Sequence, residues 1–181
     1  VLPGMRAGFG GADQGVWLLT EALGCRWFGL VSAGRAPLPG GWDVSRPEPN
    51  LLRMTSPDFT LWVVAGRQLV SAEGLEVHAL GLCEPVEERI PCREMIRAIH
   101  GAGGAAAIPY GFGKWRGDRR KVLEEMAAGL DAPFLLSDSA VRPGNRSFGA
   151  AFPELARSGR PVVAGSDPLP LAREEERIGC Y

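Results

Sequence analysis

The sequence predicts an α/β fold in which parallel strands alternate with helices. Apolar, strand-like segments alternate with helix-like segments through the second half of the chain, from about residue 91 to residue 165. The chain has 181 residues, which is enough for one domain with a sizeable core. This length favours a small or incomplete barrel over a full eight-fold one.

The first segments are predicted as one helix, one strand and one irregular excursion. Val16–Leu23 has helical spacing and stops at Gly24, a residue that suits the position after a helix end. Arg26–Val31 then predicts a short buried strand. Residues 35–57 contain five prolines and predict irregular structure, either a surface excursion or a lid, with Trp42 packed onto the body, inside a single domain spanning residues 1–181.

Three apolar or alternating segments follow and predict strands with a hairpin. Phe59–Val64 is apolar, and Gly66–Val70 continues it as a second extended piece. After a turn at Glu73-Gly74, Leu75–Leu82 alternates as a strand does.

The second half predicts the repeated strand and helix units. Pro91 opens a helix whose apolar face carries Met95, Ile96 and Ile99. The remaining expected elements are a strand at Ala105–Ile108, a helix marked by Val122 to Leu130, a strand at Pro133–Leu136, a helix at Phe152–Arg157 and a closing strand at Pro161–Ala164.

Composition excludes several classes of function. The net charge is -1, so no overall field favours nucleic acid or an anionic membrane, and we expect neither as a partner. No apolar run reaches the roughly 18 residues of a membrane span. The four cysteines lack CxxC spacing, which predicts reduced, mostly buried thiols and a cytoplasmic location. The oligomeric state does not follow from the sequence.

A basic, glycine-containing segment is the most distinctive feature. It runs from Tyr110 to Lys121 and carries Lys114, Arg116 and Arg119. Glycines free backbone amides and arginine offers a planar fork, so the segment could hold a phosphate or carboxylate. The alternative is a solvated, basic helix start whose Trp115 covers the core.

Two aspartates are candidate catalytic residues. Asp138 and Asp167 each follow a predicted strand, where a carboxylate pair or metal ligands could form. The alternative is that each caps the turn or helix after it. His78 and His100 have no metal-like companion at nearby spacing, and a structural role is expected for both.

Several motifs in order resemble the PHP (polymerase and histidinol phosphatase) superfamily. Gly66–Leu69 followed by Glu76–Gly81 is similar to the family's GxE…EVHxLG segment. Ala98–Gly104 resembles the approach to its His-Pro motif, and Gly165-Ser166-Asp167 with Ile178-Gly179 resembles its closing segment. The resemblance spans about Gly15 to Tyr181. It implies a distorted seven-stranded (β/α) barrel, complete or lacking its first strand, and metal-dependent phosphoester hydrolysis.

The family's metal ligands are largely replaced here. Its glutamate falls on Gln68, its His-Pro histidine on Ile108 or Tyr110, and its last histidine on Leu169. Among all the metal-ligand positions of the family, only the one at Asp167 keeps its ligand. Since a multi-metal phosphoesterase needs several such ligands, the resemblance predicts the fold while arguing against the activity. It also predicts that the strand ends at Gln68, Ile108, Asp138 and Asp167 converge on one face.

Two functions follow as hypotheses. The first is a catalytically degenerate, metal-free PHP-like protein that binds a partner or an anionic or phosphorylated small molecule. Its ligand-binding residues would be Gln68, Tyr110, Lys114, Arg116, Arg119 and Arg142. The alternative is a hydrolase of phosphorylated small molecules that uses Asp138 and Asp167 with Lys114 and Arg119, and a divalent metal as cofactor. An upstream segment carrying HxH would favour this alternative.

Overall fold

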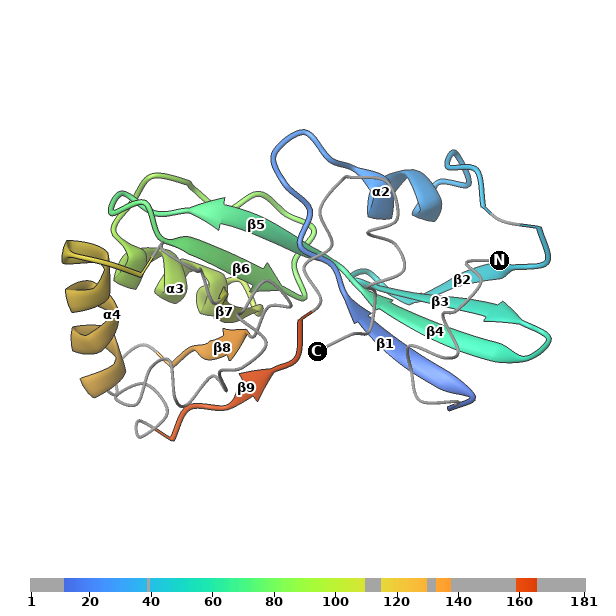
Figure 1. Ribbon diagram of the computed structural model, residues 1–181. Helices are drawn as coiled ribbons and strands as arrows, with labels where there is room; N and C mark the ends of the chain where they lie inside the picture. The colour runs from blue at the N-terminus through green and yellow to red at the C-terminus, as the bar shows by residue number, and fades with distance from the viewer. Residues whose placement is uncertain (1–11, 39, 110–114, 130–132, 138–158, 166–181) are drawn as a thin grey trace.

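A computed structural model describes residues 12–38, 40–109, 115–129, 133–137 and 159–165. In this part of the chain the strands form two mixed sheets that lie side by side (Figure 1). We call them sheet A, with four strands, and sheet B, with five.

Sheet A has the strand order β1-β4-β3-β2. β1 runs parallel to β4, whereas β3 is antiparallel to both β4 and β2. The strands are β1 (Gln14–Leu18), β2 (Asp43–Glu48), β3 (Leu51–Ser56) and β4 (Phe59–Val64).

Sheet B has the strand order β5-β6-β7-β8-β9. β5, β6 and β7 are antiparallel to one another in turn, and β7, β8 and β9 are parallel. The strands are β5 (Gly66–Val70), β6 (Glu76–Leu80), β7 (Ala105–Pro109), β8 (Leu135–Ser137) and β9 (Val162–Val163).

A nearly continuous strand joins the two sheets. Only Ala65, which is buried, separates the end of β4 from the start of β5. The backbone after β1 follows this strand across the junction, because the Leu19 N–H donates to the Val64 carbonyl at 3.0 Å and the Glu21 N–H donates to the Gly66 carbonyl at 3.1 Å. The junction is therefore held by backbone pairing as well as by the chain itself.

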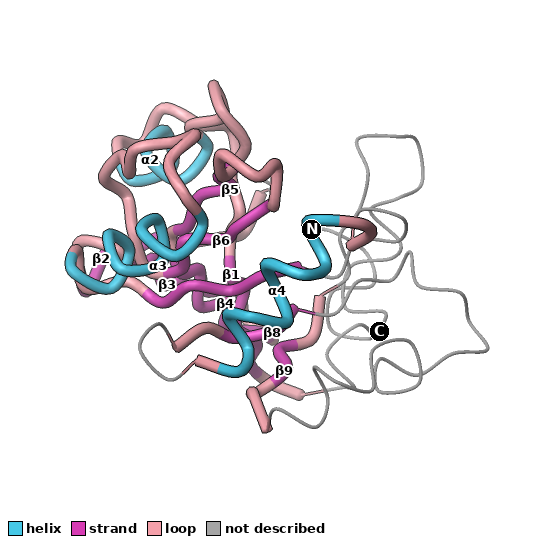
Figure 2. The backbone as a smooth tube through the Cα atoms, turned by 90° about the vertical axis from the view of Figure 1, so that its left-hand side faces the viewer, coloured by secondary structure: helices cyan, strands magenta, loops and turns pink. Residues whose placement is uncertain are grey.

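Each sheet has its own hydrophobic cluster. The cluster on sheet A includes Phe28 and Val31 from α2 (Trp27–Ser32), which lies above the sheet in Figure 1. The cluster on sheet B takes residues from α3 (Cys92–Gly101) and α4 (Asp118–Ala128). Figure 2, seen from the α4 side, shows α4 in front of the strands and α2 set apart from it.

The expected PHP-like (β/α) barrel is wrong for the described residues. A (β/α) barrel needs parallel strands throughout, but β5, β6 and β7 are connected as antiparallel neighbours. The described strands form two open sheets and no closed barrel. The expectation holds only locally, where β7, β8 and β9 are parallel.

The first two predicted elements have exchanged types. Residues predicted as a helix from Val16 contribute to strand β1, and Leu23 at the end of that segment is 88% exposed. Residues predicted as a strand form α2, which buries Phe28 and Val31 at helical spacing. Short apolar runs do not distinguish the two periods, and pairing with β4 decided the first case.

The proline-rich excursion at 35–57 is partly regular, which corrects the prediction. Strands β2 and β3 lie within it and pair around a turn at Pro49-Asn50. Pro47 is tolerated because β2 is an edge strand and its register is irregular between Ser45 and Glu48. The packing of Trp42 is confirmed, since its ring meets that of Phe59 edge to face, with 6.5 Å between the two ring centroids.

The later elements are confirmed. These are β4, the β5–β6 hairpin, α3, β7, α4, β8 and β9, each close to its expected position. The helix expected at Phe152–Arg157 lies outside the described residues. No helix in the described ranges is long and apolar enough to cross a membrane.

Candidate functional site

A pocket of about 360 Å³ lies where sheet A meets sheet B. We call it the junction pocket. Its wall combines residues of α2 and the β2 strand with residues of β5 and of the segment after β6. The lining residues are Glu21, Arg26, Phe28, Gly29, Ser32, Ala33, Arg46, Ala65, Gly66, Arg67, Leu82 and Cys83.

Gly66 allows the backbone to pass closely at this junction. A Cβ atom at this position would overlap the Leu19 carbonyl oxygen and would lie 3.0 Å from the Ala79 carbonyl oxygen. The lack of a side chain therefore lets the segment after β1 pair beside β5. That pairing, a parallel bridge between Glu21 and Arg67, brings both residues to the pocket.

The Glu21 carboxylate holds the start of α2. Its Oε1 accepts a hydrogen bond from the Phe28 N–H at 3.2 Å. This contact fixes Phe28, whose ring is only 3% exposed, at the inner wall of the pocket. Ser32, further along α2, also lines the pocket, and its hydroxyl is buried with no hydrogen-bond partner.

Three arginines give the pocket its charge. Arg67 Nη1 donates to the Cys25 carbonyl at 3.1 Å. Arg46 donates to the Pro49 carbonyl through Nε, at 3.1 Å, and through Nη2. Arg26 is exposed beside them. Among the lining residues Glu21 is the one acidic side chain, so positive charge is in excess.

Cys83 lies between the charged groups and the inner wall. Its Sγ is 3.6 Å from the Pro49 carbonyl, the same acceptor that Arg46 uses. Burial raises the pKa of the Cys83 thiol, and the positive charge of Arg46 opposes that rise without cancelling it. The side chain is therefore a neutral thiol at neutral pH rather than a nucleophilic thiolate.

Most of the residues predicted for the site lie outside the described ranges. These are Asp138, Asp167, Tyr110, Lys114 and Arg142. The two catalytic aspartates therefore remain predictions. In the described ranges no group of three or more His, Cys, Asp or Glu side chains is placed to hold a metal ion.

Gln68 lies on β5, away from the core of sheet B. In the strand register it is opposite His78, which in turn is opposite Ala107. His78 Nε2 lies 3.1 Å from the Glu76 carboxylate, so this histidine has a polar partner on its own strand. Because neighbouring residues alternate between faces, Ile108 points to the other face, where it is fully buried. The expected convergence of Gln68 with Ile108 is wrong.

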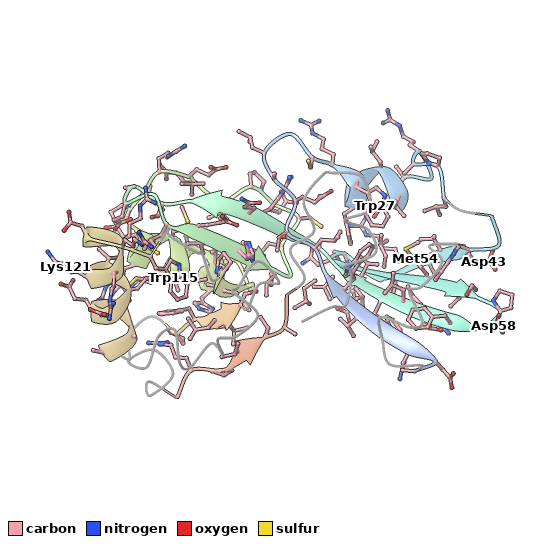
Figure 3. All side chains as sticks on the ribbon, in the orientation of Figure 1. Trp27, Asp43, Met54, Asp58, Trp115 and Lys121 are labelled. Atoms are coloured by element: carbon pink, nitrogen blue, oxygen red, sulfur yellow. The ribbon has the colours of Figure 1, made fainter. Side chains whose placement is uncertain are left out.

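The described part of the basic segment fits the structural alternative. Trp115 is 5% exposed within the cluster of sheet B, while Lys121 points outward (Figure 3). Lys121 pairs with Asp118 at 3.2 Å, and Arg120 with Glu124 at 2.6 Å. The Arg119 guanidinium lies beside Gly74 in the β5–β6 turn, and Arg116 is exposed. Neither Arg116 nor Arg119 lines the junction pocket.

His100 and the cysteines are also placed. His100 lies 3.2 Å from the Gly104 carbonyl through Nδ1 and 2.7 Å from the Pro133 carbonyl through Nε2, which ties α3 to the segment before β8. The two carbonyls lie outside α3, so the expected contact with the last carbonyls of the helix itself is not the one observed. The expectation of mostly buried thiols is wrong for the described cysteines, since Cys92 is buried but Cys83 is half-buried and Cys25 is exposed; Cys180 lies outside the described residues.

Sequence reasoning missed the arginines that meet at the pocket. Arg26, Arg46 and Arg67 are about 20 residues apart, so no window of the sequence shows them together. The position of Arg67 in its strand was the one available signal. Arg67 precedes Gln68, so its side chain faces the opposite side of the sheet from that predicted ligand-binding residue. No family model, no curated protein and no solved structure matches this chain.

Proposed function

We propose that this chain binds a small anion in the junction pocket. The observation that carries the proposal is the set of three arginines around one open cavity with a single carboxylate among them. Guanidinium groups bind carboxylates and phosphates through paired, charge-assisted hydrogen bonds. The first hypothesis from the sequence was also binding, of an anionic ligand or a partner, but it placed the site at Gln68, Tyr110, Lys114, Arg116, Arg119 and Arg142.

Hydrogen bonding within the protein leaves most of this donor capacity unused. Arg67 donates one N–H to the Cys25 carbonyl, and Arg46 donates two N–H groups to the single carbonyl oxygen of Pro49. Both contacts orient the side chains while leaving further N–H groups for a ligand. Pre-oriented donors lose less entropy on binding than freely rotating ones.

The state of the Cys83 thiol is an argument for a binding site rather than for nucleophilic catalysis. Burial raises the pKa of the Cys83 thiol and so disfavours the thiolate, and Glu21 already accepts the Phe28 N–H. The hydrolase alternative depends on Asp138 and Asp167, which lie outside the described residues, and it stays a prediction. The cytoplasmic location expected from the cysteine spacing is kept as part of the proposal.

Calorimetric titration with acetate and with sulfate at low ionic strength tests the proposal. Arg67→Gln should weaken binding of either anion by about 1–2 kcal/mol, roughly 5- to 30-fold, since it removes one charge-assisted interaction at a partly exposed site. Raising the salt concentration should weaken binding in the unmodified protein, because exposed charges are screened.

Two further variants locate the site. Arg53→Gln removes the same charge from β3, where Arg53 lies over the Trp62 ring at 5.6 Å, and it should leave binding unchanged. Arg119→Ala tests the location expected from the sequence. The proposal fails if neither anion binds, or if Arg119→Ala weakens binding while Arg67→Gln does not.

A further inference from the structure

The inner wall of the junction pocket is apolar. Phe28, Ala65 and Leu82 line it and are 3%, 2% and 4% exposed. The arginines at positions 26 and 46 are exposed and so lie toward its mouth. Taken over all its lining residues, the exposed surface of the pocket is more apolar than polar, so a ligand that only carried charge would leave apolar surface in contact with water.

The charge of the pocket suits a singly charged head group. Three guanidinium groups attract an anion, while the Glu21 carboxylate on the same wall repels each additional negative charge. A carboxylate also matches the planar fork of arginine with two oxygens. These features favour a monocarboxylate over a multiply charged phosphate.

The size of the pocket limits the rest of the ligand. Its volume of about 360 Å³ is near the lower end of the range of small-molecule sites, about 300–1,000 Å³. Gly29 of α2 and Ala33, the residue after this helix, keep this side of the wall free of long side chains. A Cβ atom built on Gly29 meets nothing within 4 Å, so the space beside the helix is open.

We infer that the preferred occupant is a monocarboxylate with a short apolar body, which rests on the proposed function. The head group is held by the arginines, with Arg67 the least exposed of them, and the body lies against Phe28 and Leu82. Affinity for such a ligand grows with the length of its apolar part. It does so only until the body fills the pocket.

A homologous series of straight-chain carboxylates, from acetate to octanoate, tests this inference by calorimetry. Each added methylene should tighten binding by up to about fourfold, the factor that corresponds to about 0.8 kcal/mol per buried CH₂. The gain should end where the chain outgrows the cavity. The alcohol of matching length should bind at least tenfold more weakly, since it lacks the charge, and sulfate should bind more weakly than hexanoate.

Two glycine variants locate the apolar body. Gly29→Leu places a side chain where the structure has open space, and glycine is a poor residue within a helix, so the variant should fold. It should weaken hexanoate binding at least tenfold while changing acetate binding much less. Gly101→Leu at the end of α3, where a Cβ also meets nothing within 4 Å, is the matched control and should bind hexanoate as the unmodified protein does.

Cys83 provides a second readout. With Cys25 and Cys180 replaced by Ser, hexanoate should slow the labelling of Cys83 by a thiol reagent, because the ligand occupies the space beside the sulfur. Equal labelling rates with and without saturating hexanoate would overturn the assigned location.

The outcomes separate this inference from the proposed function. Equal affinity along the whole series, with binding still dependent on Arg67, overturns the inference and leaves anion binding in place. Equal binding of the alcohol, or no binding of any anion, overturns both. Undiminished hexanoate binding in Gly29→Leu also overturns the inference.

Discussion

Replacing Gly66 by alanine should separate the segment after β1 from the long β4–β5 strand. The new Cβ would overlap the backbone oxygen of Leu19 and would press on the oxygen of Ala79 on β6. Both neighbours are backbone atoms, so relieving the overlap requires a shift of the backbone and not just of a flexible side-chain end. The segment carrying Glu21 must therefore shift.

The size of the effect follows from the bonds at risk. The shift endangers three backbone hydrogen bonds across the junction, those from the N–H groups of Leu19, Glu21 and Gln68, at 3.0, 3.1 and 3.0 Å. Each contributes about 1 kcal/mol net. Alanine restricts the unfolded chain more than glycine does, which offsets about 0.5–1 kcal/mol of this loss in stability. We expect the free energy of unfolding to fall by about 2–2.5 kcal/mol.

Chemical denaturation followed by circular dichroism measures this change. Gly29→Ala is the matched control, because its Cβ meets nothing within 4 Å and it lies in α2, where alanine is favoured by about 0.5–1 kcal/mol. A loss of less than about 0.5 kcal/mol in Gly66→Ala would refute the idea that the close approach of Leu19 builds the junction.

Two more predictions concern the start of α3. Both oxygens of Glu73 accept from the Cys92 N–H, at 3.2 and 3.0 Å, so Glu73→Ala should destabilise the fold by about 1 kcal/mol, and Glu73→Gln by less, in the same denaturation assay. Burial, and then the Glu73 charge, raise the pKa of Cys92 from 9.0 to about 12. Since the unfolded thiol loses its proton first, the free energy of unfolding should fall as pH rises from about 9 to 12, by up to about 4 kcal/mol. Cys92→Ala should remove that part of the pH dependence; an unchanged profile would contradict it.

The elements that could be predicted from the sequence are those with a long or unambiguous pattern. α3 carries Met95, Ile96 and Ile99 on one face, and all three are fully buried. The β5–β6 hairpin is marked by a Glu-Gly turn between alternating residues. In both cases local preference and final packing agree.

The connection of the strands could not be predicted in the same way. Periodicity identifies a strand but does not say which neighbour it pairs with, so β7, β8 and β9 suggested a parallel fold for the whole chain. The antiparallel pairing of β6 with β7, across the 24 residues between Leu80 and Ala105, depends on contacts between distant segments. One such pairing is enough to exclude the barrel.

The pocket could not be predicted because charged residues that are close in the folded protein are often far apart in the sequence. Along α4, Arg120 and Lys121 are close to acids three or four residues away, so this basic run is partly neutralised by its own helix. Arg46 and Arg67 come from different sheets and donate hydrogen bonds to neutral backbone carbonyls, and Glu21 is the one acidic side chain among the residues that line their pocket. An arginine keeps its charge in both cases, but a paired carboxylate offsets that charge at a distance, whereas a neutral carbonyl does not. Among the described residues, this contrast between the junction pocket and the basic run along α4 is the reason for placing the proposed anion site at the pocket.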